Sequence, residues 1–271
     1  MPDLANYSVR DAIARHGLDA RKSLGQHFIL DLNLTARIAA MAGDLEGRNI
    51  VEVGPGPGGL TRALLDTKAG RIVAVELDRR AIAAIEELRQ HAPERLRIIE
   101  ADAMKQDLSA LCDSPRQIIA NLPYNIGTPL LVGWLRQAAR WERMTLMFQM
   151  EVAERICAAA DTDAYGRLSV LAQWCCTATI HMRIPPAAFS PPPKVFSAVI
   201  GLIPHAEQPP AELFGVMERL TAAAFGQRRK MLRSALKPLG GDALLTRAGI
   251  DSSRRAETLT VAEYDRLVRL L

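Results

Sequence analysis

The segment at 51–61, VEVGPGPGGLT, constrains the fold more than any other part of this chain. A short apolar run ends in a glycine- and proline-rich turn, and an amphipathic stretch follows directly. Gly54, Gly56 and Gly59 have the spacing G-x-G-x-x-G, which is typical of a strand–turn–helix unit that faces a nucleoside. Glu76 ends the next apolar run, where a carboxylate can accept hydrogen bonds from two ribose hydroxyls.

Apolar runs with the length of strands alternate with helical stretches as far as residue 150. Such alternation predicts crossover connections and a mostly parallel sheet, which is an α/β fold of the Rossmann-like type. Near the N-terminus, a helix is expected at 8–17, and Asp31 is expected to cap a second helix. We predict strands at 49–53, 71–77, 96–102, 116–122 and 144–150.

The pattern loosens after residue 166. Two apolar runs, 175–184 and 194–203, flank a proline-rich segment and predict an antiparallel pair of strands. The segment at 204–210 has the composition of a linker, and 211–271 is helical in character. We therefore predict an α/β domain at 1–205 and a small helical domain at 206–271.

The glycine turn fits two ligand classes, a nicotinamide dinucleotide and S-adenosylmethionine. Pro55 and Pro57 remove two backbone N–H groups, which matters only for a ligand with a pyrophosphate. Glu52 adds a negative charge that tolerates the ammonium and sulfonium of S-adenosylmethionine. Asp102 ends a later run and can accept from an adenine amino group, although a cap or turn role is the alternative. These features favour S-adenosyl-L-methionine as the cofactor.

The segment at 118–131, IIANLPYNIGTPLL, ends a predicted strand on an amide and continues into a proline and an aromatic residue. This order suits chemistry on the exocyclic amine of adenine, whose lone pair is delocalised into the ring. The Asn121 side-chain oxygen and the Leu122 carbonyl can accept from the two N–H bonds, and Pro123 orients that peptide. Tyr124 can stack on the base, which must lie outside a helix. Catalysis would then consist mainly of positioning.

Charge and cysteine content bear on which partners and metals the protein can bind. Lys and Arg number 34 against 30 for Asp and Glu, and this mild excess permits a nucleic-acid partner. The four cysteines have no metal-binding spacing, so no metal is expected. Neither a signal peptide nor an apolar stretch of about 18 residues is visible, and we expect a cytoplasmic protein without membrane contact.

From about residue 21 to its end, the chain resembles the ribosomal RNA adenine N6,N6-dimethyltransferase family, and within it the bacterial small-subunit branch. The resemblance rests on KSLGQHFILD, VEVGPGPGGLT, VAVELDRR, EADAM, NLPYNIGTPL, AYGRLSVLAQ, FSPPPKVFSAVI and AFGQRRKMLRSAL, in this order. It implies dimethylation of two adjacent adenines near the 3′ end of 16S rRNA in the small ribosomal subunit, with S-adenosylmethionine as donor. It also implies a role in subunit biogenesis, a catalytic domain at 1–205, an RNA-binding domain at 206–271, and a monomer.

The resemblance also implies roles for single residues. The implied donor-binding residues are His27, Ile29, Gly54, Gly56, Glu76, Asp102 and Asn121. The implied catalytic residues are Asn121, Leu122, Tyr124 and Phe189. Phe189 would be the second aromatic side chain on the target base; a core or loop phenylalanine is the alternative. His27 stands where many relatives have asparagine, and Phe196 stands where an acidic residue is common.

A basic segment, QRRKMLRSALK at 227–237, is the candidate RNA contact. Arg229, Arg233 and Lys237 have the spacing of one helical face, flanked by Arg228 and Lys230. We expect Arg228, Arg229, Lys230 and Arg233 to contact phosphates, where binding is salt-dependent and independent of sequence. The alternative is a solvated helix face. DARKSLG near the N-terminus is a weaker candidate.

Three other functions stay open at this point. One is a related enzyme that modifies large-subunit rRNA, which the PPPKV segment and Leu122 disfavour. A second is an assembly factor whose catalysis is secondary. The third is a nicotinamide oxidoreductase, which predicts no role for 121–124.

Overall fold

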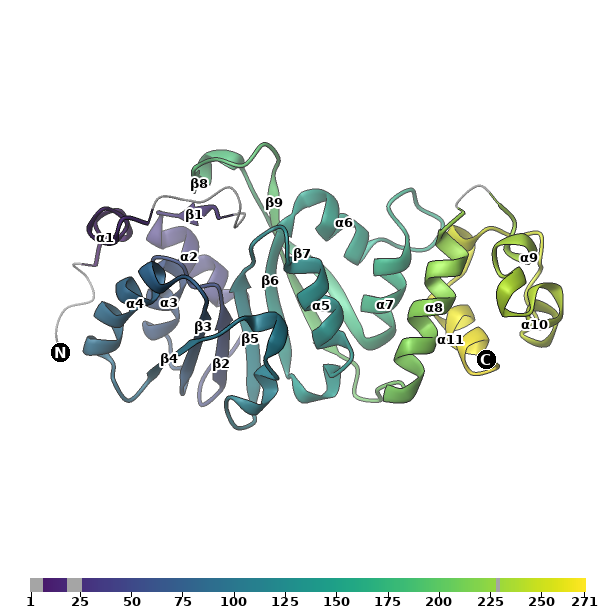
Figure 1. The fold of residues 1–271 in the computed structure, drawn as a ribbon, viewed down its shortest axis with the longest axis horizontal. Helices are drawn as coiled ribbons and strands as arrows, with labels where there is room; N and C mark the ends of the chain where they lie inside the picture. Colours follow the sequence, from purple (N-terminus) through teal and green to yellow (C-terminus); the bar gives the residue numbers. More distant parts are fainter. Residues whose placement is uncertain (1–6, 19–25, 228–229) are drawn as a thin grey trace.

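The computed structural model describes residues 7–18, 26–227 and 230–271 (Figure 1). The strands are β1 (Phe28–Ile29), β2 (Asn49–Val53), β3 (Ile72–Glu76), β4 (Leu96–Glu100), β5 (Arg116–Asn121), β6 (Arg143–Gln149), β7 (Cys176–Ile184), β8 (Phe189–Ser190) and β9 (Ser197–Pro204). The helices are α1 (Val9–His16), α2 (Leu32–Ala40), α3 (Gly59–Leu65), α4 (Arg79–His91), α5 (Gly127–Leu135), α6 (Met150–Cys157), α7 (Arg167–Cys175), α8 (Phe214–Phe225), α9 (Leu232–Ala235), α10 (Gly241–Arg247) and α11 (Val261–Val268).

Seven strands form the central sheet in the order β4-β3-β2-β5-β6-β9-β7. The first five are parallel, whereas β9 is antiparallel to both β6 and β7. The parallel sheet and the antiparallel pairing of the last two long strands are confirmed. Parallel strands bring their carboxyl ends to one edge, so Glu76, Asp102 and Asn121 lie on the same side of the sheet.

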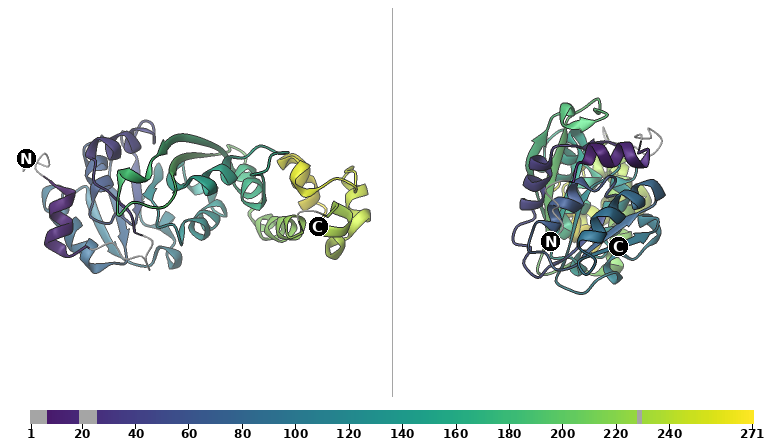
Figure 2. Two further views of the ribbon diagram at one scale, coloured as in Figure 1. Left: turned by 90° about the horizontal axis from the view of Figure 1, so that it is seen from above. Right: turned by 90° about the vertical axis from the view of Figure 1, so that its left-hand side faces the viewer.

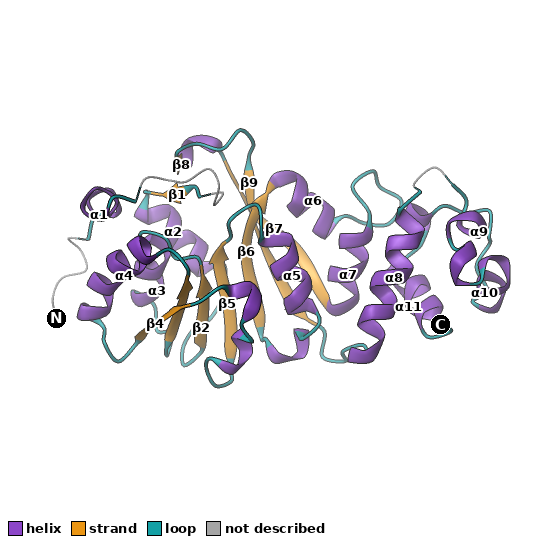
Figure 3. Cartoon of the chain, viewed as in Figure 1, coloured by secondary structure: helices purple, strands orange, loops and turns teal. Residues whose placement is uncertain are grey.

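Side chains alternate between two cores, one on each face of the sheet. In β2, Ile50 faces the core that α2 and α3 cover, while Val51 and Val53 face the core of α5 and α7. Figure 3 shows the strands between these helical layers. Burial on both faces explains why the parallel strands are nearly continuous apolar runs.

Local signals set the ends of the first two helices, as predicted. The Ser8 side chain accepts from the Asp11 N–H at the start of α1, and Gly17 ends that helix with a left-handed φ of 57°. Asp31 caps α2 by accepting from the N–H groups of Asn33 and Leu34.

The last four helices extend the molecule at one end, and Figures 1 and 2 show its elongated shape. Helix α7 and the residues just before it connect them to the sheet. The rings of Trp174, in α7, and Phe214 lie 6.2 Å apart, and those of Tyr165, two residues before α7, and Phe225 lie 6.1 Å apart. Apolar packing is therefore continuous between the two parts. The domain boundary near residue 205 stays a prediction.

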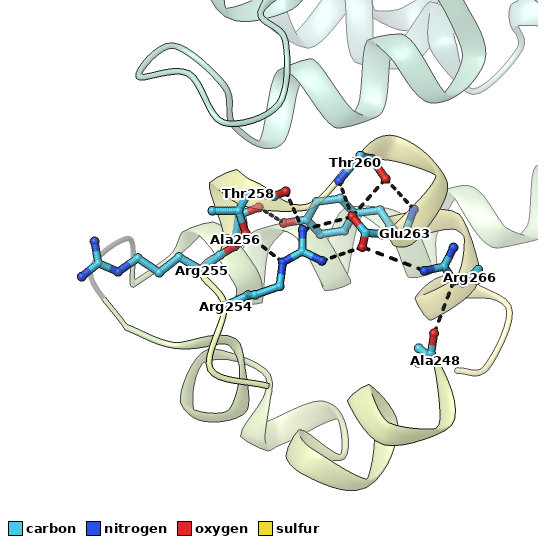
Figure 4. A network of polar contacts seen from close by, with 9 residues as sticks. Ala248, Arg254, Arg255, Ala256, Thr258, Thr260, Glu263 and Arg266 are labelled. Atoms are coloured by element: carbon cyan, nitrogen blue, oxygen red, sulfur yellow. Dashed lines mark hydrogen bonds and ion pairs between the residues drawn. The ribbon is translucent and has the colours of Figure 1, made fainter. Parts of the chain in front are cut away.

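A polar network stabilises the segment before α11 (Figure 4). Arg254 donates to the Glu263 carboxylate at 2.6 Å and to the Thr258 carbonyl at 2.7 Å. Glu263 also accepts from Thr260 in a capping box at the start of α11. These bonds lower the pKa of Glu263 to about 2, chiefly through the Arg254 guanidinium.

The predicted basic helix is wrong as a continuous element. Met231 forms a β-bridge with Arg255, so the backbone pairs outside any helix just before α9. Helix α9 holds only four residues, and Lys237 belongs to a separate 3₁₀ turn. Lys230 and Arg233 are exposed. Arg228 and Arg229 lie outside the described residues, as does the whole of DARKSLG.

Within the described ranges, no helix is long and apolar enough to cross a membrane. The same ranges contain no group of three or more His, Cys, Asp or Glu side chains placed to hold a metal ion.

Candidate active site

A cavity of about 600 Å³ lies at the carboxyl edge of the parallel strands. The turns after β2, β3 and β5 form its walls, and the segment around β1 covers it. Among the predicted site residues, those on its lining are His27, Ile29, Gly54, Gly56, Glu76, Asp102, Asn121, Leu122 and Tyr124. The described basic residues of the C-terminal part and Phe189 are not among the residues that line it.

The glycine turn lies between β2 and α3, as the sequence predicted. Gly54 and Gly56 have φ values of 67° and 55°, which residues with a Cβ rarely adopt. A Cβ atom at Gly56 would lie 3.0 Å from the Phe28 ring, and one at Gly54 would lie 3.5 Å from the Pro123 ring. The turn therefore touches both the covering segment and the Asn-Leu-Pro-Tyr turn.

Tyr7 reaches the same turn from the N-terminal segment. Its hydroxyl donates to the carbonyl of Pro57 at 2.5 Å. Helix α1, two residues further on, packs against α4 and is linked to it by an ion pair of Arg15 with Glu87 at 2.6 Å. No sequence motif marks Tyr7, because its role depends on a contact with a residue fifty positions away.

Glu76 lies at the end of β3, 9% exposed. Its carboxylate accepts from the N–H groups of Leu77 at 2.8 Å, Asp78 at 2.9 Å and Gly56 at 3.3 Å. Burial raises the pKa of Glu76, and these three hydrogen bonds oppose that shift. They orient a buried acceptor toward the cavity, as a ribose contact requires.

Glu52 was predicted to carry a negative charge, but in the structure its carboxyl group is mostly neutral. Its side chain is 1% exposed and accepts from the Thr61 hydroxyl at 2.7 Å. Burial raises the pKa of Glu52 to about 8, so the carboxyl is mostly protonated at neutral pH. A cation beside it would favour the ionised form, so the predicted negative charge would develop with a cationic ligand.

Asp102 combines the two roles that its position suggested. Its side chain accepts from the Met104 N–H at 3.0 Å and thereby caps a 3₁₀ turn at Ala103–Lys105. The same side chain lies on the cavity wall, 3.7 Å from the Lys105 ammonium. The cap fixes the direction of the carboxylate at the cavity edge.

Asn121 ends β5 and points toward the covering segment. Its Nδ2 donates to the His27 carbonyl at 3.2 Å, which leaves Oδ1 as an acceptor. Leu122 is 2% exposed, so its side chain anchors the turn in the core. The Pro123 carbonyl accepts from the Gly127 N–H at 3.1 Å and joins the turn to α5.

Tyr124 lies on the cavity wall with its ring against His27. The two rings are stacked with centroids 5.2 Å apart. The Tyr124 hydroxyl shares a hydrogen bond of 2.6 Å with Ser197, a fully buried residue at the start of β9. Burial raises the pKa of Tyr124. Ser197, which no sequence motif marked, therefore fixes the position of this ring.

Phe189 lies beside the cavity rather than on its wall. It is 5% exposed, and β8 pairs with β1 so that Phe189 is opposite Ile29. Its ring meets the edge of His27 at 6.4 Å, and the His27 Nδ1–H donates to the Pro191 carbonyl at 2.7 Å. In this structure His27 is the ring next to Tyr124, and a base contact of Phe189 stays a prediction.

Comparisons with known proteins agree on one family. The model of the family "Ribosomal RNA adenine dimethylase" matches residues 17–271. The chain is 64% identical over 268 residues to the ribosomal RNA small subunit methyltransferase A of Gluconobacter oxydans (strain 621H), covering 99% of this chain and 88% of that protein. It is 58% identical to the protein of the same name in Sinorhizobium medicae (strain WSM419), covering 97% of each.

Solved structures show the same fold. A dimethyladenosine transferase from Plasmodium falciparum has a TM-score of 0.74 at 23% identity, covering 89% of this chain and 96% of that one. The 23S rRNA methyltransferase ErmE has a TM-score of 0.68 at 24% identity, covering 90% and 99%.

Proposed function

The chain belongs to the ribosomal RNA adenine dimethylase family, and from this membership we propose that it dimethylates two adjacent adenines of 16S rRNA. The adenines are those near the 3′ end of the RNA, in the small ribosomal subunit, and the donor is S-adenosyl-L-methionine. One observation carries the proposal: the Asn-Leu-Pro-Tyr turn and the glycine turn line one cavity and lie side by side, since a Cβ at Gly54 would lie 3.5 Å from the Pro123 ring. A donor and an acceptor can therefore meet there.

The residues of the cavity fit an adenosine with a cationic substituent. Glu76 is a buried, oriented acceptor for ribose hydroxyls, and Asp102 is an acceptor at the cavity edge. Gly56 lets the backbone approach the ligand closely. Glu52 would release its proton when a positive charge lies in the cavity, which offsets the cost of burying that charge. When bound, the donor supplies the electrophilic methyl group.

The adenine amine that receives the methyl group needs groups that accept hydrogen bonds from its N–H bonds more than it needs a strong base. Asn121 keeps Oδ1 available because Nδ2 is used by the His27 carbonyl. The Leu122 carbonyl is the second acceptor that we propose, since the adjacent proline restricts this peptide. Tyr124 would stack on the adenine, an interaction worth about 1–3 kcal/mol. The target base therefore has to displace or extend the present stack of Tyr124 with His27.

The remaining parts of the proposal concern the whole protein. We propose that Lys230 and Arg233, with Arg228 and Arg229, contact RNA phosphates, and that His27 and Ile29 close over the donor. The donor's adenosine would also meet Asn121. We further propose that the protein acts as a monomer in the cytoplasm and takes part in small-subunit biogenesis.

A labelled-methyl experiment tests the proposed substrate. Small and large subunits from a strain without this methylation are incubated with the protein and labelled S-adenosylmethionine. We expect label in 16S rRNA alone, and none with an Asn121→Ala variant. Label in 23S rRNA alone would refute the proposed substrate, and no label with intact subunit binding would favour an assembly factor.

A further inference from the structure

Phe196 is exposed in a chain that otherwise covers its aromatic side chains. All six phenylalanines, three tryptophans and four tyrosines lie within the described ranges, and only Phe196 among them is exposed. Its exposed fraction is 51%. A single exposed apolar residue is common on protein surfaces, so the position of Phe196 decides whether it matters.

Phe196 is not on the cavity lining but is adjacent in sequence to the residue that bonds Tyr124, and we call this position the rim of the acceptor site. Phe196 precedes Ser197, whose hydroxyl bonds to Tyr124 at 2.6 Å. Since adjacent Cα atoms are about 3.8 Å apart, the Phe196 backbone lies within roughly 9 Å of the Tyr124 hydroxyl. The Phe196 carbonyl accepts from the Met150 N–H at 2.8 Å, which fixes its backbone to the start of α6.

The loop before Phe196 is restrained. Three consecutive prolines at 191–193 limit its backbone, and Pro193 is buried. The Pro191 carbonyl is bound by His27, a residue of the cavity lining. A restrained loop loses little conformational entropy on binding, so an aromatic side chain on it is suited to recognition.

Lys194 adds a positive charge two residues before the ring. Its side chain is exposed, and no ion pair of Lys194 is found in the described part of the chain. Arg183 in β7, by contrast, faces Glu154 at 3.9 Å. An exposed ring beside an available ammonium is the combination that single-stranded nucleic acids bind, by base stacking and by phosphate contact.

We propose that Phe196 and Lys194 bind the nucleotide next to the target adenine. The Phe196 ring stacks on the neighbouring base, and the Lys194 ammonium contacts a phosphate. The inference rests on the proposed function, because a target adenine in the cavity places adjacent nucleotides at this rim. A base drawn out of its helix also leaves its neighbour partly unstacked, and a second ring compensates for that loss.

The first test measures the KM for unmethylated small subunits. It distinguishes stacking of the Phe196 ring from a general apolar contact. We expect Phe196→Ala to raise the KM for subunits about fivefold to tenfold, at the lower end of base–aromatic stacking, with the affinity for S-adenosylmethionine unchanged. Phe196→Trp should restore the KM, and Phe196→Leu should not. Val195→Ala, at the neighbouring exposed residue, is the matched control and should behave as the wild type. A wild-type KM for Phe196→Leu would overturn the stacking role.

The second test does not depend on methyl transfer. Fluorescence anisotropy measures the affinity for a labelled ten-nucleotide adenine RNA, for the wild type and for Phe196→Ala and Lys194→Ala. We expect both variants to bind more weakly, and Lys194→Ala to show a shallower dependence on salt. Equal affinities for all three proteins would refute the inference. If the wild type failed to methylate subunits, the proposed function would be refuted. The RNA affinities of the three proteins would still decide whether Phe196 and Lys194 bind RNA. A subunit defect without an RNA-binding defect would indicate a protein contact and overturn the RNA assignment.

Discussion

Replacing Gly56 with alanine should damage the donor site in a way that the structure allows to be quantified. The φ of Gly56 is 55°, and a left-handed conformation costs an L-residue roughly 1–2 kcal/mol. The new Cβ would also lie 3.0 Å and 3.2 Å from two atoms of the Phe28 ring. Phe28 is only 7% exposed, so its ring cannot move aside freely. Relief of the contact should add about 1 kcal/mol or more.

Gly17→Ala is a matched control that measures the cost of the left-handed backbone conformation alone. Gly17 has a φ of 57°, and a Cβ atom there would meet nothing within 4 Å. We expect Gly17→Ala to lower the free energy of unfolding by about 1 kcal/mol, and Gly56→Ala by about 2–3 kcal/mol. For a chain of this size each kcal/mol corresponds to about 2–4 °C in Tm.

Two assays check these values. Thermal or urea unfolding compares the stabilities, and calorimetric titration with S-adenosylmethionine compares the affinities. Gly56→Ala should weaken donor binding at least about tenfold, since roughly 1.4 kcal/mol of distortion at the cavity wall suffices, whereas Gly17→Ala should not. Equal losses of stability together with equal donor affinities would refute the argument that the Phe28 contact shapes the donor site.

The remaining predictions concern three side chains around the cavity. Tyr124→Ala should lower methyl transfer about 5- to 150-fold with donor affinity largely kept, while Tyr124→Phe retains the ring and loses less; an unchanged rate for the alanine variant would exclude stacking. Tyr7→Phe removes the hydrogen bond to the glycine turn and should weaken donor binding by about 0.5–1.5 kcal/mol in titrations, with the transfer rate at saturation unchanged. Because the pKa of Glu52 in the folded chain, about 8, lies above its ordinary value of 4.5, its contribution to stability is present below about pH 4.5 and is lost as the pH rises through 8. Glu52→Gln lacks this loss, so its Tm relative to the wild type should rise from pH 5 to about pH 9; parallel Tm curves would contradict the burial argument.

Local sequence patterns were enough to predict the glycine turn and the acidic and amide residues at the strand ends. The G-x-G-x-x-G spacing predicted a strand–turn–helix unit, and the structure has this unit as β2, the glycine turn and α3. Strand periodicity placed Glu76, Asp102 and Asn121 at strand ends, and parallel topology then brings these ends together.

The features that could not be predicted from the sequence depend on contacts between residues far apart in the chain. The position of Phe189 depends on the pairing of β8 with β1, whose residues are far apart in the chain. The basic segment was expected to be one helix, but the bridge from Met231 to Arg255 interrupts it. Likewise, the protonation of Glu52 follows from complete burial, which a motif does not report.

The identity of the methylated nucleoside tests the central claim most directly. Small subunits methylated by the protein would be digested, and the modified nucleosides and their neighbours identified by mass spectrometry. The account predicts N6,N6-dimethyladenosine at two adjacent positions near the 3′ end of 16S rRNA, because the Asn121 and Leu122 oxygens are proposed to hold the exocyclic amine. A methyl group on a ring atom, on a ribose or on another base would contradict it.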